Sequence, residues 1–423
     1  MSMDPVGAAA AQDLAISTAA ERLAHLVQPV AEAEDVALRH AQGRVLARDI
    51  VSPIDVPPHD NSAMDGYAFD GLQLAAGQAL RLRVIGTVLA GRVWSGEIGV
   101  GECVKIMTGA PMPQGLDTVV PFELAALQGD THIVVAPGAV RRGDNRRRRG
   151  EDLKAGHSAL RQGQALGPAA LGLIASLGLP SAPVWRRVRV AYFSTGDEIL
   201  NPGDPPREGA VYDSNGFSLM GLLTRLGVDV IDLGVVRDTP AQLEAALRAA
   251  AQQADAIVTS GGVSMGDADH TKATMAQLGE VAFWRIAMRP GRPMAVGHIR
   301  RAGHGAPALL FGLPGNPVAA MVTFLVFVRP ALQRLMGAVV TDPVCLRATS
   351  SERLRKKPGR TEYQRGIVTR AADGALSART TGPQGSGVLR SMVEANGLIV
   401  LPHEQGDVAV GDTVEVMMFD GAI

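Results

Sequence analysis

The feature that most constrains the fold is a repeated alternation of strand and helix patterns between residues 184 and 336. Short apolar, β-branched runs predict buried strands, and amphipathic patterns between them predict helices. Such repeated units form a parallel sheet with helices on both faces, so we predict an α/β fold with a central three-layer α/β/α domain over residues 183–336 and a mainly parallel sheet. The strands are expected at 188–193, 228–236, 256–259, 281–287, 293–297 and 308–311, and the helices at 216–226, 240–253 and 318–328.

Two β-rich regions flank that alternation. Residues 50–149 contain short β runs between prolines and glycines without a helical pattern, which predicts an inserted β-rich domain. Residues 337–423 show the same texture, which predicts a C-terminal domain resembling a β-barrel. The remaining pieces, 1–49 and 150–182, include an amphipathic helix pattern, and we predict that they form a small mixed α/β linker domain.

Charge and cysteine content narrow the functional class. The chain has 41 basic and 42 acidic side chains, and this balance argues against a general nucleic-acid or membrane-surface binder. Its two cysteines, Cys103 and Cys345, lie far apart, which fits a reducing compartment. The amino terminus lacks a secretory signal pattern, and the longest apolar run, 318–328, is about half of the ~20 residues of a membrane span. We therefore expect a cytoplasmic protein with no nucleic-acid or membrane partner.

Polar and glycine-rich residues follow several of the predicted strands. In an open parallel sheet the ligand lies beyond the carboxyl ends of the strands, so these segments are expected to meet at one edge. Acidic and glycine-rich loops that converge there favour a binding site over unrelated turns. The segments are Thr195-Gly196-Asp197-Glu198, Asp238, Ser260 to Asp269, and Leu313 to Pro317.

The segment Ser260-Gly261-Gly262 is the best candidate for an anion site. Its glycines let the backbone turn sharply between a strand and a helix, which places free N–H groups beside small hydroxyls. Asp267 and Asp269 in the same loop would repel an anion unless a cation lay between them, so the loop indicates metal-assisted phosphate chemistry. The alternative is that the glycines close an ordinary turn and the aspartates cap a helix.

Other segments are also unusually polar or basic. Residues 60–68 and 105–111 combine acidic, hydroxyl and glycine residues, although Asx and Ser/Thr turns explain either loop without function. The arginine-rich segment 141–152 is hemmed by acidic residues, and we favour a clamp for a polyanionic small molecule over a solvated face. Three arginines that lie nearby in sequence could balance the charge of the acidic strand-end segments, whereas isolated arginines are more often surface residues. These are Arg285, Arg289 and Arg292.

Taken together, these motifs resemble the molybdopterin molybdenumtransferase family, known as MoeA or molybdenum insertase and related to the E domain of gephyrin. The resemblance covers nearly the whole chain in the right order. It implies a homodimer of four-domain subunits in which adenylylated molybdopterin and molybdate react, with a divalent cation such as Mg²⁺, to give molybdenum cofactor and AMP. The motifs are Asp60 to Ala68, Met107 to Pro111, Arg149 to Asp152, Ser194 to Glu198, Ser260 to Ser264, Pro290-Gly291, and Leu313 to Pro317.

The resemblance also implies roles for individual residues, of which Glu198, Asp238 and Asp269 are the expected ligands of the divalent cation. The catalytic positions fall on Asp60, Thr108, Asp152, Glu198, Asp238 and Asp269. The substrate-binding positions fall on Thr195, Gly196, Asp197, Ser260, Gly261, Gly262, Ser264, Arg285, Arg289, Pro314, Asn316, Pro317, Arg365 and Ser386.

Molybdate is a dianion, so its expected ligands are hydrogen-bond donors and cations rather than carboxylates. We expect Arg285 and Arg289, together with Arg365 and Ser386, to hold it. Relatives tend to carry lysines at the first two positions, and an arginine fork is not equivalent to a lysine point charge.

Three other functions share parts of this pattern. Molybdopterin adenylyltransferase resembles residues 184–336 alone, and the flanking domains favour the insertase. The competence-damage-inducible nucleotide amidohydrolases have a similar Gly-Asp-Glu strand end, but at their amino terminus. A non-catalytic molybdopterin-binding scaffold could lose the acidic loops that this chain keeps. Molybdopterin adenylyltransferase and proteins of molybdoenzyme maturation are also candidate partners.

Overall fold

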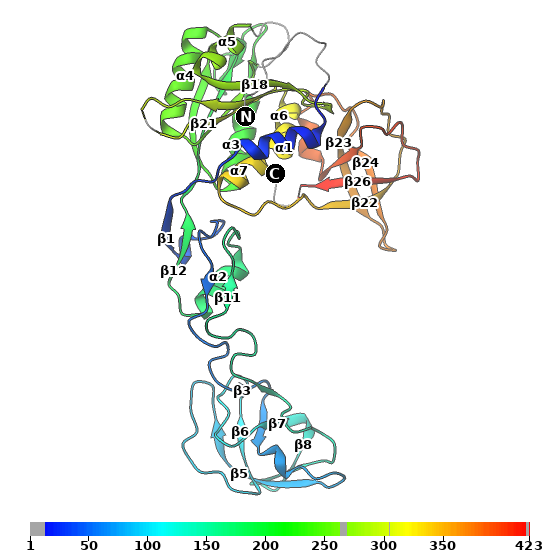
Figure 1. Cartoon of the computed structure of the whole chain (residues 1–423). Helices are drawn as coiled ribbons and strands as arrows, with labels where there is room; N and C mark the ends of the chain where they lie inside the picture. Colours follow the sequence, from blue (N-terminus) through cyan, green and yellow to red (C-terminus); the bar gives the residue numbers. More distant parts are fainter. Residues whose placement is uncertain (1–12, 263–268, 304, 420–422) are drawn as a thin grey trace.

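The computed structural model describes residues 13–262, 269–303, 305–419 and 423. Figure 1 shows an elongated subunit in which an α/β module and a β-barrel module lie side by side at one end. A second β module forms the opposite end, and a narrow linker joins it to the other two. The predicted mixed α/β architecture with two β-rich additions is confirmed.

The central module is built on one six-stranded sheet with the order β16-β13-β17-β21-β20-β18. The first four strands are parallel, and β20 and β18 continue the sheet as antiparallel neighbours. The prediction of a mainly parallel sheet is therefore confirmed. The strands are β13 (Arg189–Thr195), β16 (Asp229–Val236), β17 (Ala256–Ser260), β18 (Gly279–Arg285), β20 (Pro293–Ile299) and β21 (Ala308–Leu313).

Alternate residues of β13 face opposite sides of this sheet, as strand geometry requires. Val190 and Tyr192 pack in one hydrophobic cluster, whereas Ala191 and Phe193 pack in the other. Helices cover both faces, which gives the predicted three layers. One face carries α1 (Ile16–Leu26), α3 (Ser214–Leu226), α6 (Pro317–Thr323) and α7 (Arg329–Leu335), and the other carries α4 (Pro240–Gln253) and α5 (Asp269–Leu278).

The longest apolar helical run joins α6 to α7 through a π-helical segment, η4 (Phe324–Val328). Over Pro317–Leu335 it is long and apolar enough to cross a membrane, with a mean hydropathy of 1.5. However, 72% of its most apolar window is buried inside the subunit, so it serves as a core helix. Its first turn begins at Pro317, which suits the first helical position because proline lacks an N–H donor.

The inserted β module is a curled six-stranded sheet with the order β7-β4-β6-β5-β9-β8. Separate hydrophobic clusters lie around Phe69 and around Ile106, so each face of the sheet has its own core. The strands are β4 (Gly66–Phe69), β5 (Leu80–Val88), β6 (Glu102–Ile106), β7 (Thr118–Pro121), β8 (Ala125–Gln128) and β9 (His132–Val135).

The linker consists of short antiparallel pairs and one helix around a core that includes Leu46 and Ile174. The chain crosses the linker twice, once on its way to the inserted module and once on its return. These two crossings run side by side, because each strand of the incoming chain pairs with one of the returning chain. The elements are β1 (Ala33–Ala37), β2 (Ile50–Val51), β11 (Ser158–Leu160), α2 (Pro168–Ser176) and β12 (Ser181–Trp185).

The C-terminal module is a closed five-stranded barrel, because β23 pairs with both β24 and β25. A short strand from the central module, β19 (Met288–Arg289), adds to β23 and joins the two modules. This junction places the loop between β18 and β20 against the barrel. The barrel strands are β22 (Cys345–Ser350), β23 (Thr361–Arg370), β24 (Leu376–Thr380), β25 (Gly397–Leu401) and β26 (Thr413–Met418).

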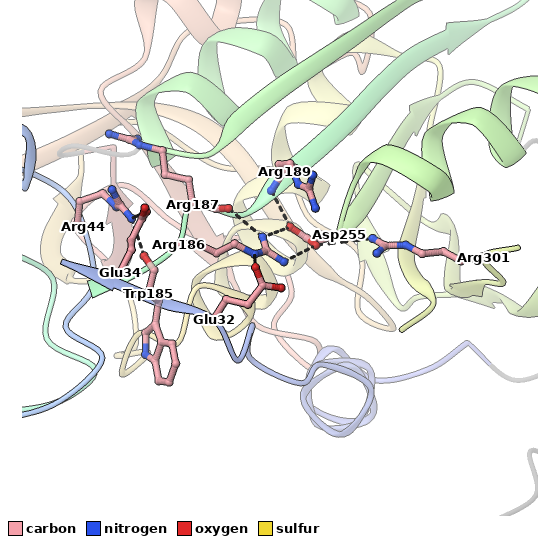
Figure 2. A network of polar contacts seen from close by, with 9 residues as sticks. All are labelled: Glu32, Glu34, Arg44, Trp185, Arg186, Arg187, Arg189, Asp255 and Arg301. Atoms are coloured by element: carbon pink, nitrogen blue, oxygen red, sulfur yellow. Dashed lines mark hydrogen bonds and ion pairs between the residues drawn. The ribbon is translucent and has the colours of Figure 1, made fainter. Parts of the chain in front are cut away.

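A polar network joins the linker to the central module (Figure 2). Arg186, directly after β12, donates through both terminal nitrogens to Asp255, over 2.7 and 2.9 Å, and through Nε to Glu32 over 2.9 Å. The Asp255 carboxylate also accepts from the Arg189 amide over 2.9 Å, and Arg301 lies 3.7 Å away. The carboxylate at the start of β17 therefore anchors the linker to the base of the central sheet.

Candidate functional site

A cavity of about 1190 Å³ lies between the carboxyl ends of the central strands and the barrel module. It receives residues from the ends of β13, β17 and β21, from the start of α3, from the loop before β20 and from a barrel turn. Its lining includes Thr195, Gly196, Glu198, Tyr212, Asp213, Asn215, Asp238, Ser260, Gly261, Gly262, Arg289, Arg292, Pro314, Asn316, Pro317, Arg360 and Ser386.

The turn after β17 lets neighbouring strand ends approach closely. Gly261 has φ +93, and a Cβ at this position would lie 2.3 Å from the carbonyl oxygen of Thr195. The Gly261 N–H donates to the Leu313 carbonyl over 3.1 Å, which ties the end of β17 to that of β21. Only glycine combines this φ with so close a neighbour, so the glycine pair brings backbone to the cavity wall where a side chain would block it.

A chain of buried hydroxyls supports the cavity floor. Ser194 Oγ donates to Asp213 Oδ1 over 2.9 Å, so Tyr192 donates to Ser194 Oγ. Asp213 Oδ1 also accepts from the Gly216 amide over 2.8 Å and thereby caps α3. Burial raises the pKa of the Tyr192 hydroxyl, with a smaller contribution from the Asp213 charge, so this hydroxyl stays a donor.

Asn215, on the first turn of α3, joins two of the strand-end segments. Its amide nitrogen donates to Ser260 Oγ over 2.6 Å and to the Gly315 carbonyl over 2.7 Å. A carbonyl can only accept, so these contacts fix the orientation of the amide. Asn215 therefore locks the Gly-Gly turn to the loop that follows β21.

Carboxylates from three segments line the cavity. Glu198 and Asp238 are exposed, whereas Asp213 is buried in the hydroxyl chain. Among the described residues no cluster of three acidic, histidine or cysteine side chains could hold a metal. Asp269 begins α5, but its side chain lies outside the described residues, so the predicted trio of cation ligands stays a prediction.

Arginines from the loop between β18 and β20 and from the barrel supply positive charge at or near the cavity. Arg289 lines the cavity and lies 3.5 Å from Glu362. Arg365 is 1% exposed and lies behind the wall, where it donates to Ser391 Oγ and to the Gly385 carbonyl, both over 2.9 Å. Burial, and secondarily the charge of Arg289, lowers the pKa of Arg365 to about 10.

The structure gathers the strand-end segments in one cavity but leaves several predicted substrate-binding residues away from it. Arg285 and Arg365 do not line it, and Asp197 is exposed with its carbonyl bonded to Arg207. Ser264 and Asp267 lie outside the described residues. Molybdate binding by Arg285 and Arg365 stays a prediction, and direct contact would require these side chains to reach past the wall.

Three of the predicted catalytic residues lie around the inserted module and do not line the cavity. Thr108 donates through its amide and hydroxyl to Asp65 Oδ1, over 2.6 and 2.7 Å. These bonds, the amide first, hold the pKa of Asp65 below its usual range. Asp60 accepts from the Arg149 amide over 2.8 Å, and Asp152 is exposed near the start of the returning chain.

The arginine-rich segment 141–152 also lies away from the cavity. Its side chains pair with acidic residues of their own region: Arg142 with Asp117, Arg146 with Asp60, and Arg149 with Asp55. These pairs leave less charge for a polyanion than the sequence indicated. The clamp stays a prediction, and within one subunit it is not part of the cavity described above.

Sequence reasoning did not identify several cavity residues. Asp213 and Asn215 directly precede the predicted helix 216–226, and their polar partners come from distant segments. Tyr212 and Arg360 gave no signal, since each belongs to a segment without a motif. Arg292 was considered only as a balancing charge. A useful signal would have been the Asp-Ser-Asn triplet directly before a helix that follows a strand end.

Family comparisons divide the chain into three matched parts. Residues 14–178 match the MoeA N-terminal region (domain I and II), residues 191–334 a probable molybdopterin binding domain, and residues 347–419 the MoeA C-terminal region (domain IV). The matches cover most of the chain in the same order as the modules of the fold.

Individual relatives match over nearly the whole length. A molybdopterin molybdenumtransferase from Haemophilus influenzae is 41% identical over 92% of this chain and 94% of its own, and one from Bacillus subtilis is 33% identical over 95% and 93%. The crystal structure of a molybdopterin biosynthesis MoeA protein from Pyrococcus horikoshii has a TM-score of 0.80 at 28% identity, covering 96% of this chain and all of the other.

Proposed function

Because this chain belongs to the MoeA family of molybdopterin molybdenumtransferases, we propose that it is the transferase that inserts molybdenum from molybdate into adenylylated molybdopterin and releases AMP. The observation that supports this most directly is the single cavity that joins a glycine turn, arginines and carboxylates. The alternatives, molybdopterin adenylyltransferase and a non-catalytic scaffold, are not favoured by relatives that match all three parts of the chain.

The glycine turn and the start of α3 suit the phosphate groups of the substrate. Gly261 and Gly262 bring backbone to the cavity wall without side chains, and Ser260 accepts from Asn215, so its own hydroxyl hydrogen remains for a ligand. Hydroxyls at such a turn bind phosphate oxygens well. Because the Gly261 N–H is already bonded to the Leu313 carbonyl, the Ser260 hydroxyl binds and orients the phosphates during AMP release, and Gly261 leaves the space for them.

The arginines of the cavity lining suit molybdate. Arg289 and Ser386 are the members of the predicted molybdate set that line the cavity. Arg365 supports the cavity wall from behind, because it holds the carbonyl of Gly385, the neighbour of Ser386. Its buried guanidinium also adds positive potential at the wall. Arg285 is the predicted member with the least support, since it does not line the cavity and it pairs with Asp13.

We propose Mg²⁺ as the divalent cation that assists AMP release. Mg²⁺ is usually bound by one or two carboxylates together with water and substrate phosphates, and Glu198 and Asp238 both line the cavity. These two residues, with Asp269, would hold it. When bound, it would neutralise charge on the phosphoanhydride that is split.

We propose a homodimer, because Asp60, Thr108 and Asp152 lie in or beside the inserted module and not at the cavity of their own subunit. Figure 1 shows that module at the far end of the linker. If these residues take part in the reaction, a second copy must bring them to the cavity. We also propose a cytoplasmic location, with molybdopterin adenylyltransferase and molybdoenzyme maturation proteins as candidate partners.

The direct test is AMP release from adenylylated molybdopterin by the purified protein, with and without molybdate and Mg²⁺. Glu198→Gln and Asp238→Asn should each lower the rate of AMP release by about 10²-fold or more while the protein stays folded. Asp373→Asn, on an exposed turn of the barrel, is the matched control and should leave AMP release unchanged. Unchanged turnover in both cavity variants would refute the cation site, and ATP-dependent adenylylation of molybdopterin would favour the adenylyltransferase instead.

A further inference from the structure

The loop between β18 and β20 forms a continuous part of the cavity wall. Residues 288–293 all line the cavity, and they include Arg289 and Arg292. Gly291 within this loop has φ +101, and a Cβ there would lie 2.4 Å from Thr323 Oγ1. The loop is therefore pressed against α6, and the position of its arginines depends on what holds it from the other side.

The segment at Asp13 and Leu14 holds the loop from that side. The Leu14 amide donates to the Arg285 carbonyl, and the Ala287 amide donates to the Leu14 carbonyl, both over 2.7 Å. Leu14 and Ile286 thereby form a parallel bridge. A segment near the amino terminus is thus fixed at the root of the cavity wall.

The Asp13 carboxylate then binds two arginines. Arg292 donates from Nε to Oδ2 over 2.8 Å and from Nη2 to Oδ1 over 3.1 Å. Arg285 Nε lies 3.1 Å from Oδ1, close enough for an ion pair but not aligned as a hydrogen bond. The Asp13 side chain is 16% exposed, so it is shielded from water more than either arginine.

Only one of these two arginines faces the cavity. Arg292 lines it and Arg285 does not. A guanidinium has five N–H donors in a rigid fork, and Asp13 occupies the edge formed by Nε and Nη2. The other edge, formed by Nη1 and Nη2, keeps three N–H donors that a second anion can use.

We propose that Asp13 is a positioning residue that fixes the Arg292 guanidinium so that its second edge binds a tetrahedral oxyanion in the cavity. This inference rests on the proposed function for the identity of the ligand, which is either molybdate or the phosphate of the adenylylated substrate. Both are tetrahedral oxyanions and present paired oxygens to a guanidinium fork. Asp13 itself touches neither substrate.

The test measures equilibrium binding of molybdate and of AMP separately, by calorimetry, to the full-length protein and its variants. Arg292→Ala should weaken binding of the relevant anion by more than tenfold, and Asp13→Ala by about 5- to 20-fold, because the fork loses its fixed orientation. Arg292→Lys should resemble Arg292→Ala. The matched control is Arg248→Ala, which removes an exposed arginine of α4 that also pairs with a carboxylate but lies away from the cavity, and it should leave both affinities unchanged.

A double-mutant cycle separates positioning from general loosening of the wall. In the Arg292→Ala background, Asp13→Ala should have no further effect. Additive effects, equal weakening by Arg248→Ala, tighter binding in Asp13→Ala, or unchanged affinity for both anions would each overturn the inference. Asp13→Asn provides a second variant if Asp13→Ala does not fold, and should weaken binding less than fivefold.

The two ligands distinguish the source of the oxyanion. Weaker binding of molybdate alone assigns the oxometal anion to Arg292, and weaker binding of AMP alone assigns the phosphate. Because no turnover is measured, the result is independent of AMP release. A protein that shows this binding behaviour but releases no AMP would disprove the proposed function and leave the role of Asp13 intact.

Discussion

Replacement of Asp255 should weaken the attachment of the linker to the central module. Asp255 is 9% exposed at its side chain and accepts three hydrogen bonds, two from Arg186 and one from the Arg189 amide. Alanine would leave the Arg186 guanidinium, 20% exposed, with only Glu32 and the Arg187 carbonyl as partners (Figure 2). The variant thus leaves a largely buried charge poorly compensated.

The expected cost of this substitution is about 3 kcal/mol in the free energy of unfolding. Breaking a buried ion pair by removing one partner costs about 3–5 kcal/mol, and the remaining bond to Glu32 places this case at the lower end. Asp255→Asn should cost about 2 kcal/mol, because it keeps one acceptor oxygen but loses the other oxygen and the charge. Glu415→Ala removes an exposed pair 3.9 Å long and should cost less than about 0.5 kcal/mol.

The cost should also depend on pH. Burial by itself raises the pKa of Asp255, but the Arg186 and Arg189 bonds outweigh it and the net pKa is lowered from 3.8. A lowered carboxyl pKa gives stability that is present above about pH 4 and is lost as the pH falls through the folded-state pKa. Urea unfolding followed by tryptophan fluorescence at several pH values measures this. A cost below 0.5 kcal/mol at pH 7, or a difference that grows on acidification, would refute the reasoning.

Three further predictions concern the cavity and the thiols. Gly261→Ala should cost about 1–3 kcal/mol and impair AMP binding, because its Cβ would meet the Thr195 carbonyl; wild-type melting and affinity would contradict this. Ser194→Ala should cost about 1–3 kcal/mol by leaving the Tyr192 hydroxyl unpaired, and added Tyr192→Phe should restore part of the loss in thermal melts. A thiol reagent should modify Cys345 but not Cys103, whose pKa is raised to about 12 mainly by burial; rapid reaction of two thiols would disprove it.

The sequence allowed the module types and most strands to be predicted, because each depends on local patterns. The strands β13, β16 and β17 are short apolar runs rich in β-branched residues, which is a local signal for a buried strand. The turns that follow them are marked by glycine and acidic residues. The position of the cavity at one edge of the sheet could be predicted from topology alone, since the carboxyl ends of parallel strands lie at the same edge. For the same reason, the residues at the strand ends were found together.

Contacts between distant segments could not be predicted in the same way. Asp13 and Arg292 are 279 positions apart, and nothing in either local pattern indicates that they meet. Similarly, arginine is a residue type that is usually exposed on a strand, but Arg365 is buried behind the barrel turn. The pairing of a charge with its partner depends on packing between modules, and a single sequence carries no period that reports it.

The side-by-side crossings of the linker make the inserted module detachable. Incoming β2 pairs with returning β11, and Val56 donates to the Leu153 carbonyl over 2.7 Å, so the two ends of the insertion are neighbours. A short turn could join them without reaching across the protein, because excision at such a point leaves the other cores intact. The shortened chain should fold by itself, and a foreign domain with adjacent termini could be grafted in its place.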